Sequence, residues 1–301
     1  MVVICGATAT GKSAAAVALA PEIGAEIVSA DSRTIYRGMD IGTAKPTPAA
    51  RAAVPHHLLD VADPREVFTL SQYQGLALAA IASVHARARV PLLVGGTGLY
   101  LRALVDGLRL PRVSPDWAFR RKAEEADGLT PGALYARLEQ VDPQAAARIH
   151  PRNVRRIIRA LEVIDRTGRP LSAQQRAEAP LWQVTMIGLR MPRPLLQRRI
   201  DERVDQQIAA GLVEEVRALV SAGVPPSTPA MQGLGYKEIV PVLEGKATLD
   251  NAVALLKRNT RRYARRQEVW FRRDTRIRWI DVGHAGAETV AMTVHAMLTM
   301  Q

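Results

Sequence analysis

The chain has 301 residues, and its 41 Lys and Arg exceed its 29 Asp and Glu, giving a formal net charge of +12. This surplus favours a polyanionic partner such as nucleic acid, although a merely basic protein would also carry it. The single cysteine, Cys5, excludes an internal disulfide, and no Cys/His cluster has the spacing of a zinc site. No apolar run approaches the about 20 residues that span a bilayer. The run at 2–5 is too short for a signal peptide, so we expect a cytoplasmic protein with no membrane partner.

Short apolar runs alternate with helical patterns in the first part of the chain. The runs at 2–5, 26–29 and 91–94 predict strands buried on both faces, and 13–20 and 71–88 predict helices. This alternation is typical of an α/β fold. It predicts a P-loop-type parallel sheet with helices on both faces.

The phosphate-binding pattern G-x-x-x-x-G-K-[ST] occurs in full between the first strand and the first helix. Its glycines let the backbone fold around an anion, so that N–H groups and the helix N-terminus face phosphate oxygens. Lys12 supplies a point charge, and the hydroxyl of Ser13 can ligate Mg²⁺. ATP, GTP and a prenyl diphosphate present the same groups to such a loop. The predicted diphosphate-binding residues are Gly6, Ala7, Thr8, Ala9, Thr10, Gly11, Lys12 and Ser13.

Polar residues follow the next two predicted strands. Asp31 comes just after the strand at 26–29, and Thr97 follows the strand at 91–94. The carboxyl ends of parallel strands form the edge where ligands bind, so both side chains could face the P-loop. Asp31 could act as a general base and Thr97 could donate to a phosphate, or each could cap a following turn. Three strand ends that converge with suitable chemistry favour the functional interpretation.

Two neighbouring features are less specific. The loop at 38–46 carries Lys45 and two glycines, which suits contact with phosphate or backbone. His56 and His57 are adjacent, so they point to different sides of an extended chain. A packing or surface role is therefore favoured over a shared metal.

The pattern becomes entirely helical after residue 112. The helical segments at 116–126, 130–140 and 152–167 are punctuated by prolines, which predicts an inserted helical domain. Strand character returns at 184–189, and long helices follow at 193–221 and 249–272, before a short strand at 277–281 and a final helix. We therefore expect a first core part at 1–112, an insertion at 113–180 and a second core part at 181–301.

Two of these helices carry basic faces. Arginines at 152, 155, 156 and 159 share one side of the helix at 152–167, opposite its apolar side. On the helix near 256–273, eight Lys and Arg cover about half the circumference, and only Glu268 opposes them. A solvated face normally mixes signs, so this pattern favours RNA or DNA. Arg217, beside two glutamates, reads by default as part of a surface ion pair.

Seven segments, taken together, resemble the tRNA dimethylallyltransferase family over nearly the whole chain. They are 6–13, 29–46, 55–60, 92–100, 152–163, 233–238 and 260–267. The resemblance implies that the P-loop holds dimethylallyl diphosphate with Mg²⁺. It also implies that the insertion and the basic helices clasp a tRNA anticodon stem-loop, with the adenine 3′ of the anticodon flipped into the site. A monomer is sufficient for this function.

The same resemblance assigns roles to individual residues. It implies that Asp31 activates the adenine N6 amine and that Lys12, Ser13, Thr97 and Arg217 steady the leaving diphosphate. Two departures from the family pattern are Ala7, where proline is usual, and Thr34, where a glutamine is common. The implied tRNA-binding residues are Asp31, Ser32, Arg33, Thr34, Arg120, Arg155, Arg156, Ile157, Ile158, Arg159, Gln232, Gly233, Leu234, Gly235, Tyr236 and Lys237.

Two other functions would explain part of the sequence. A P-loop kinase for a small metabolite would account for the P-loop and Asp31, but not for the basic helices. An RNA-binding protein switched by a nucleotide would account for the charge, but it would leave no task for Asp31 and Thr97.

Overall fold

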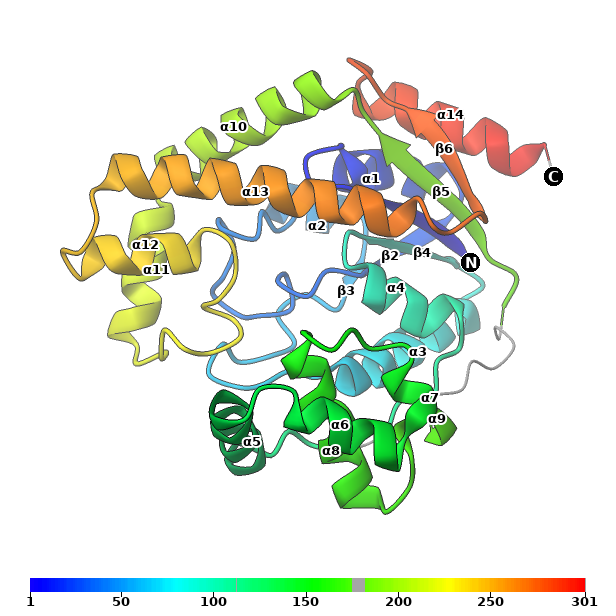
Figure 1. Cartoon of the computed structure of the whole chain (residues 1–301). Helices are drawn as coiled ribbons and strands as arrows, with labels where there is room; N and C mark the ends of the chain where they lie inside the picture. Colours follow the sequence, from blue (N-terminus) through cyan, green and yellow to red (C-terminus); the bar gives the residue numbers. More distant parts are fainter. Residues whose placement is uncertain (112, 175–181, 301) are drawn as a thin grey trace. The chain divides into compact units, whose positions relative to one another are not determined.

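The computed structural model describes residues 1–111, 113–174 and 182–300 (Figure 1). The chain forms two compact units. The predicted boundaries at 112/113 and 180/181 touch residues 112, 180 and 181, which lie outside the described residues. Within the described ranges, no helix combines the length and apolar character needed to cross a bilayer. Unit 1 comprises Met1–Phe68, Gln72–Arg102 and Trp182–Gln301, and unit 2 comprises Thr69–Ser71 and Ala103–Leu181.

A parallel sheet forms the centre of unit 1, in the strand order β3-β2-β4-β1-β5-β6. The predicted α/β class is thereby confirmed. The short strand β3 was not predicted, because two histidines give no apolar pattern. The strands are β1 Val2–Gly6, β2 Ala25–Ser29, β3 His56–His57, β4 Val90–Gly95, β5 Thr185–Arg190 and β6 Ile277–Asp281.

The helices predicted at 13–20, 71–88, 249–272 and the C-terminus are present in unit 1. The helix expected at 193–221 is two helices, because Gly211 takes a left-handed φ of 98° and begins a new helix. The helices are α1 Lys12–Glu22, α2 Pro48–Ala53, α3 Leu70–Ala86, α4 Gly98–Val105, α10 Arg193–Ala209, α11 Leu212–Ser221, α12 Tyr236–Leu243, α13 Leu249–Phe271 and α14 Ala287–Thr299; α3 begins and α4 ends in residues of unit 2. Of these helices, α2, α4 and α12 were not predicted.

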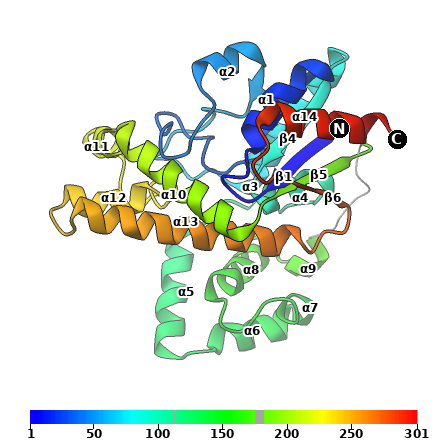
Figure 2. The ribbon, with the colours of Figure 1, turned by 90° about the horizontal axis from the view of Figure 1, so that it is seen from above.

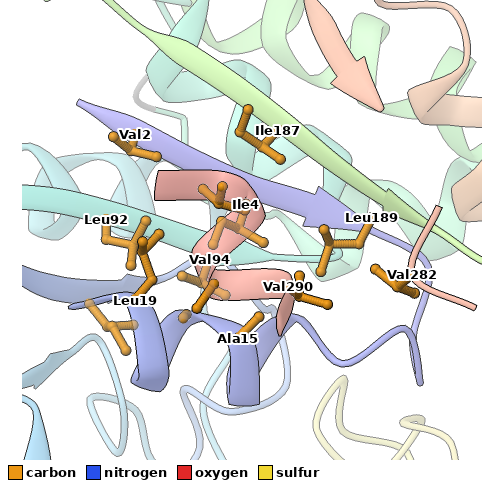
Figure 3. Close-up of a cluster of buried hydrophobic side chains, with 14 of the residues drawn as sticks. Val2, Ile4, Ala15, Leu19, Leu92, Val94, Ile187, Leu189, Val282 and Val290 are labelled. Carbon is orange, nitrogen blue, oxygen red and sulfur yellow. The ribbon is translucent and has the colours of Figure 1, made fainter. Parts of the chain in front are cut away.

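One face of the sheet is covered by α1 and α14 (Figure 3). Alternate strand residues point to this face, as the pleat requires, and Ile4 meets Leu19 and Val290 there. Ile4 and Leu19 are fully buried. Each such aliphatic side chain contributes about 1.5–3 kcal/mol by leaving water. This packing fixes the start of α1, and with it the P-loop.

The strand order reverses direction between β1 and β4. From β1 the chain continues to β2 on one side, and from β4 it continues to β5 on the other side. The two strands are hydrogen-bonded neighbours, and Cys5 pairs with Gly95. In open α/β sheets, ligands bind in the crevice at such a switch point. The fold therefore brings the P-loop beside the loop that carries Thr97.

Unit 2 is helical and has its own apolar core. Leu138, Ile157 and Leu161 are among its most buried side chains. The amphipathic pattern at 152–167 appears as α8, whose apolar side faces this core. The helices are α5 Trp117–Leu129, α6 Ala133–Val141, α7 Pro143–Ala146, α8 Val154–Thr167 and α9 Leu171–Gln174.

Candidate active site

The P-loop is wound tightly between β1 and α1. Gly6 has φ 138°, and a Cβ there would lie 2.4 Å from the carbonyl oxygen of Leu189. The carbonyl of Ala7 accepts hydrogen bonds from Lys12 Nζ at 2.6 Å and from Thr10 Oγ1 at 2.9 Å. These internal bonds hold the loop in a curved shape with α1 starting at Lys12. An anion in the curve would meet the N-terminus of that helix.

Gln267 of α13 joins the P-loop to the loop after β4. Its Oε1 accepts the N–H of Thr8 at 2.8 Å, and its Nε2 donates to the carbonyl of Gly96 at 2.8 Å. The side chain is buried, and a Cβ at Gly96 would lie 2.3 Å from its Nε2. The sequence placed Gln267 in a family-like segment but gave it no role, because its partners lie far away in the chain.

Asp31 and Thr97 lie on adjacent loops that are hydrogen-bonded to each other. Asp31 Oδ1 accepts the N–H of Arg33 at 2.8 Å, so the side chain caps the following turn, and it also lines both cavities described below. Thr97 Oγ1 accepts the N–H of Ser32 at 3.1 Å, so its side chain is turned toward the Asp31 loop. Thr97 is also hydrogen-bonded to Tyr263, and burial raises the pKa of that phenol to about 12.

Two cavities in unit 1 meet at Asp31. The smaller cavity, of about 110 Å³, extends over the P-loop. Its polar lining includes Lys12, Ser13 and Arg203. The larger cavity has about 290 Å³. Asp31 lines both, together with Thr8, Thr43, Arg203 and Tyr263.

The two cavities differ in their remaining walls. Apolar side chains of Ala16, Ile27, Leu59 and Val94 line the smaller one. A short hydrocarbon chain could lie against this wall while its polar end meets the P-loop. The larger cavity is lined by most residues of the two unit 1 segments expected to bind RNA, 31–34 and 232–237. Besides Asp31, these are Ser32, Arg33, Gln232, Leu234, Tyr236 and Lys237.

Three residues of those two segments, Thr34, Gly233 and Gly235, do not line the larger cavity, and Tyr236 lines it while being held by contacts of its own. Thr34 is buried, bonded to Ser29 Oγ at 3.0 Å, and lines the smaller cavity instead. Gly233 and Gly235 do not line either cavity. Tyr236 is also buried, and its hydroxyl donates to Glu215 at 2.7 Å. Its ring packs so closely on Gly42 that a Cβ there would lie 2.6 Å away.

Positive charge dominates where the cavities meet. Burial and the nearby Arg203 lower the pKa of Lys12 to about 8, while Asp31 acts in the opposite direction. Burial also lowers the pKa of Arg203, again opposed by Asp31. Two poorly solvated cations therefore share one carboxylate. A bound polyanion would neutralise the excess and restore the ordinary pKa of Lys12.

This pKa predicts a pH dependence of diphosphate binding. Above pH 8 Lys12 of the free protein is mostly deprotonated, and it must take up a proton from solvent when a diphosphate binds. The affinity for inorganic diphosphate should therefore fall by roughly an additional tenfold per pH unit above pH 8, with proton uptake. Calorimetry in buffers of different ionisation enthalpy measures both. In Lys12→Arg, which stays charged, this additional fall should be absent; an equal pH profile in both proteins would contradict the assignment.

The cationic partner in the cavities is Arg203, not Arg217. Arg203 lies on α10 and lines both cavities. Arg217, to which the resemblance assigned a role at the diphosphate, lies exposed on α11 and lines neither. Helical periodicity alone could not separate the two arginines. Which residue of α10 faces the edge of the sheet depends on how that helix packs, and this packing cannot be predicted from helical periodicity.

Lys45 stabilises the loop at 38–46 by hydrogen bonds and lines neither cavity. It is buried, and its ammonium donates to the carbonyl of Tyr36 at 2.6 Å, to Asp40 at 2.6 Å and to Asp60 at 2.5 Å. All three donors are used, so Lys45 is not available to a phosphate. Glu215 holds the same loop from the other side by accepting three backbone N–H groups, those of Asp40, Ile41 and Gly42.

His56 and His57 point to different surroundings, as expected for adjacent residues of a strand. His57 Nε2 lies 2.7 Å from Glu26 Oε2, beside the guanidinium of Arg87. The hydrogen bonds from Arg87 lower the pKa of Glu26 to about 2, so this is an ion-pair cluster at the sheet. His56 points elsewhere and lines the smaller cavity, where the sequence gave it no role.

Known proteins share this architecture and sequence. A model of the IPP transferase family matches residues 34–274. The chain belongs to the IPP transferase family. It is 54% identical over 274 residues to the tRNA dimethylallyltransferase of Roseiflexus sp. (strain RS-1), covering 91% of this chain and 90% of that protein. It is 51% identical over 287 residues to the enzyme of the same name from Thermomicrobium roseum, covering 95% and 87%.

Solved structures agree with this family assignment. The full-length tRNA isopentenylpyrophosphate transferase from Bacillus halodurans superposes with a TM-score of 0.74 at 41% identity, covering 99% of this chain and 95% of that one. A eukaryotic dimethylallyltransferase studied while acting on tRNA superposes with a TM-score of 0.80 at 26% identity, covering 99% and 77%. The resemblance drawn from the sequence motifs is confirmed.

The metal and thiol chemistry available to this family member is limited. Among the described residues, no group of three or more His, Cys, Asp and Glu side chains could hold a metal ion. Ser13 offers a hydroxyl at the smaller cavity. Mg²⁺ commonly binds through one or two protein ligands plus substrate phosphates, so this donor set fits an ion that arrives with a diphosphate. Burial raises the pKa of Cys5 to about 12, which excludes a thiolate nucleophile at neutral pH.

The basic face expected on α8 in unit 2 is smaller than the sequence suggested. The helix begins at Val154, so Arg152 precedes it. Arg159 and Arg120 both bind the buried Glu162, at 2.5 Å and 2.8 Å. Arg155 and Arg156 remain exposed, whereas the side chains of Ile157 and Ile158, also named as RNA-binding, are buried in the core. Glu162 lies three residues after Arg159, and this spacing could have signalled the pairing.

Glu162 should be a stability centre of unit 2. It also accepts the N–H of Asp116 at 2.7 Å. Burial raises its pKa, but the hydrogen bonds from Arg120, Asp116 and Arg159 outweigh burial and lower the pKa overall. Replacing the carboxylate in Glu162→Gln should cost about 2 kcal/mol, because two guanidinium groups lose a charged acceptor. Urea unfolding measures this, with the exposed Glu139→Gln as control; equal stability of the two variants would contradict it.

Proposed function

We propose that this chain, a tRNA prenyltransferase by family, transfers a dimethylallyl group from dimethylallyl diphosphate to N6 of the adenosine 3′ of the anticodon, releasing diphosphate. The observation that carries the proposal is the position of Asp31 between two cavities. One cavity opens on the P-loop and the other on the segments 32–33 and 232–237. A donor and an acceptor could thus approach one carboxylate from two sides.

The lining of the smaller cavity suits the chemistry of the donor. Its diphosphate would face the P-loop N–H groups, Lys12 and Arg203, and its five-carbon chain would lie against Ile27 and Val94. Ser13 would hold Mg²⁺ together with phosphate oxygens, and the ion would add positive charge at the leaving group. Negative charge grows on the diphosphate as the carbon–oxygen bond breaks. Fixed cations there stabilise the transition state more than the ground state.

The acceptor fits the larger cavity. An adenine must leave its stack to enter such a pocket. Its N6 amine is a weak nucleophile because the lone pair is delocalised into the ring, so a positioned proton acceptor is needed. Asp31 would take the N6 proton as the new carbon–nitrogen bond forms. Thr97, bonded to Ser32 at one side and to Tyr263 at the other, would orient the Asp31 loop; it is not among the residues that line either cavity.

The exposed Arg155 and Arg156 of unit 2 are proposed to contact the phosphate backbone of the anticodon stem-loop. Arg120 and Arg159, already paired with Glu162, would then shape the face that carries them. The proposed reaction needs only a monomer.

A direct transfer assay tests the proposal. The full chain is mixed with Mg²⁺, radiolabelled dimethylallyl diphosphate and an anticodon stem-loop with adenine 3′ of the anticodon. The control RNA carries guanine at that position. Label in the adenine RNA alone would support reaction, donor and base together. Label in neither RNA would overturn the proposal, and consumption of ATP without RNA would then favour a small-molecule kinase.

A further inference from the structure

A second basic surface lies on the side of α13 that faces away from the two cavities. A groove of about 710 Å³ runs between α13, α10 and the neighbouring strands of unit 1. It shares Arg261 and Arg262 with a shallower hollow along the first half of α13, so the two are continuous. Figure 2 shows α10 lying alongside α13.

Periodicity separates this groove from the active site. At about 100° per residue, Arg265 points some 200° away from Tyr263, which lines the cavities. An α-helix with side chains is about 10–12 Å thick. Ile200 of α10 lines both the larger cavity and the groove but is itself buried, so the two are neighbours divided by that side chain. The groove arginines Arg262, Arg265 and Arg272 lie on the other side of α13 from Tyr263, so a base bound in the larger cavity leaves their charge to another part of the ligand or to another molecule.

The charge of the groove is not compensated within the described part of the chain. Nearby cations on the same helices do have acidic partners: Lys257 pairs with Asp205 and Arg261 with Asp201. By contrast, exposed arginines on the groove walls have no carboxylate within 4.0 Å among the described residues, and Glu268 is the single acid in the lining. These arginines are Arg193, Arg262, Arg265 and Arg272.

The shape and chemistry of the groove suit a nucleic-acid backbone. Arg262 to Arg272 spans about 15 Å along α13 at 1.5 Å per residue, enough for several phosphates of one strand. Trp279 and the half-exposed Val269 add apolar surface between the guanidinium groups. Arginines interleaved with aromatic and aliphatic surface are typical of RNA-binding faces.

We propose that this groove binds the phosphate backbone of the tRNA substrate, outside the loop that delivers its adenine to Asp31. The inference rests on the proposed function. It divides the arginines of α13 into two groups. Arg266 lines the larger cavity and serves the reacting loop, whereas Arg262, Arg265 and Arg272 hold a remote segment of the same RNA.

The test compares two double variants that remove the same charge. Arg262→Gln/Arg265→Gln removes two groove arginines. Arg89→Gln/Arg198→Gln removes two exposed arginines that line neither the groove nor the cavities. Each protein is titrated with whole unmodified tRNA and with an unpaired oligonucleotide of the anticodon-loop sequence, over a range of salt concentrations. Melting temperatures confirm that both variants fold.

We expect the groove variant to bind whole tRNA roughly tenfold more weakly at low salt. The slope of log affinity against log salt should fall by about 1.5–2, the contribution of two phosphate contacts. Its affinity for the loop oligonucleotide should stay within twofold of the parent, as should transfer to that oligonucleotide. Unchanged tRNA affinity and slope would overturn the inference. An equal loss for both RNAs, or an equal loss in the control variant, would also overturn it. Failure of the proposed function would instead show as absent transfer by the parent protein.

Discussion

Asp31→Asn is expected to lower the rate constant of prenyl transfer by roughly 10³-fold while RNA and donor affinities stay within about twofold. The asparagine keeps an oxygen to accept the N–H of Arg33, a bond of 2.8 Å in the parent. The loop should therefore hold its shape while the charge and the basic site are lost. A positioned general base typically accounts for 10²–10⁴ in rate.

Single-turnover measurement with both substrates saturating isolates the transfer step from binding. Asp31→Ala, which also removes the acceptor for Arg33, serves as the second variant and should be no faster than Asp31→Asn. If the asparagine variant loses RNA affinity in proportion to its rate, Asp31 is a binding residue and not the proton acceptor.

Arg203→Ala should reduce transfer by roughly 10²–10³-fold, whereas Arg217→Ala should leave it within about twofold. Arg203 lines both cavities, and the guanidinium of this partly buried side chain lies close enough to Lys12 to lower the pKa of that ammonium. Removing one preorganised group that stabilises charge in the transition state commonly costs this much. Arg217 is exposed on α11 and lines neither cavity.

The two alanine variants are controls for each other, because both remove one arginine from neighbouring helices of unit 1. Calorimetric titration with inorganic diphosphate should show weakened binding for Arg203→Ala alone. The opposite pattern, with transfer lost in Arg217→Ala and kept in Arg203→Ala, would restore the role that the sequence resemblance gave to Arg217.

The part of the site that the sequence predicted is encoded locally. The P-loop pattern occupies eight consecutive residues, and Asp31 and Thr97 each follow a buried strand that its apolar run revealed. Parallel strands bring their carboxyl ends together whatever the details of packing, so the convergence of these residues could be expected.

The remainder of the site comes from helices that the sequence could describe only one at a time. Arg203, Tyr263 and Gln267 reach the cavities from α10 and α13. Periodicity shows which side of a helix is apolar, but not which polar residue at its border faces a loop from another part of the chain. Arg159 is a different case: its partner Glu162 lies three residues later on the same helix, so the sequence spacing did contain the signal for this ion pair.

The amide of Gln267 makes the P-loop conformation depend on a residue outside the motif. Eight residues identify the motif, yet one of its N–H groups, that of Thr8, is satisfied by a side chain 259 positions later in the chain. The same amide donates to the carbonyl of Gly96, so two hydrogen bonds of one side chain set the spacing between the loops that follow β1 and β4. The eight residues of the motif are therefore not sufficient by themselves to fix the conformation of the loop. Grafted into another scaffold without an equivalent of α13, it would keep its sequence and lose the partner that fixes its edge.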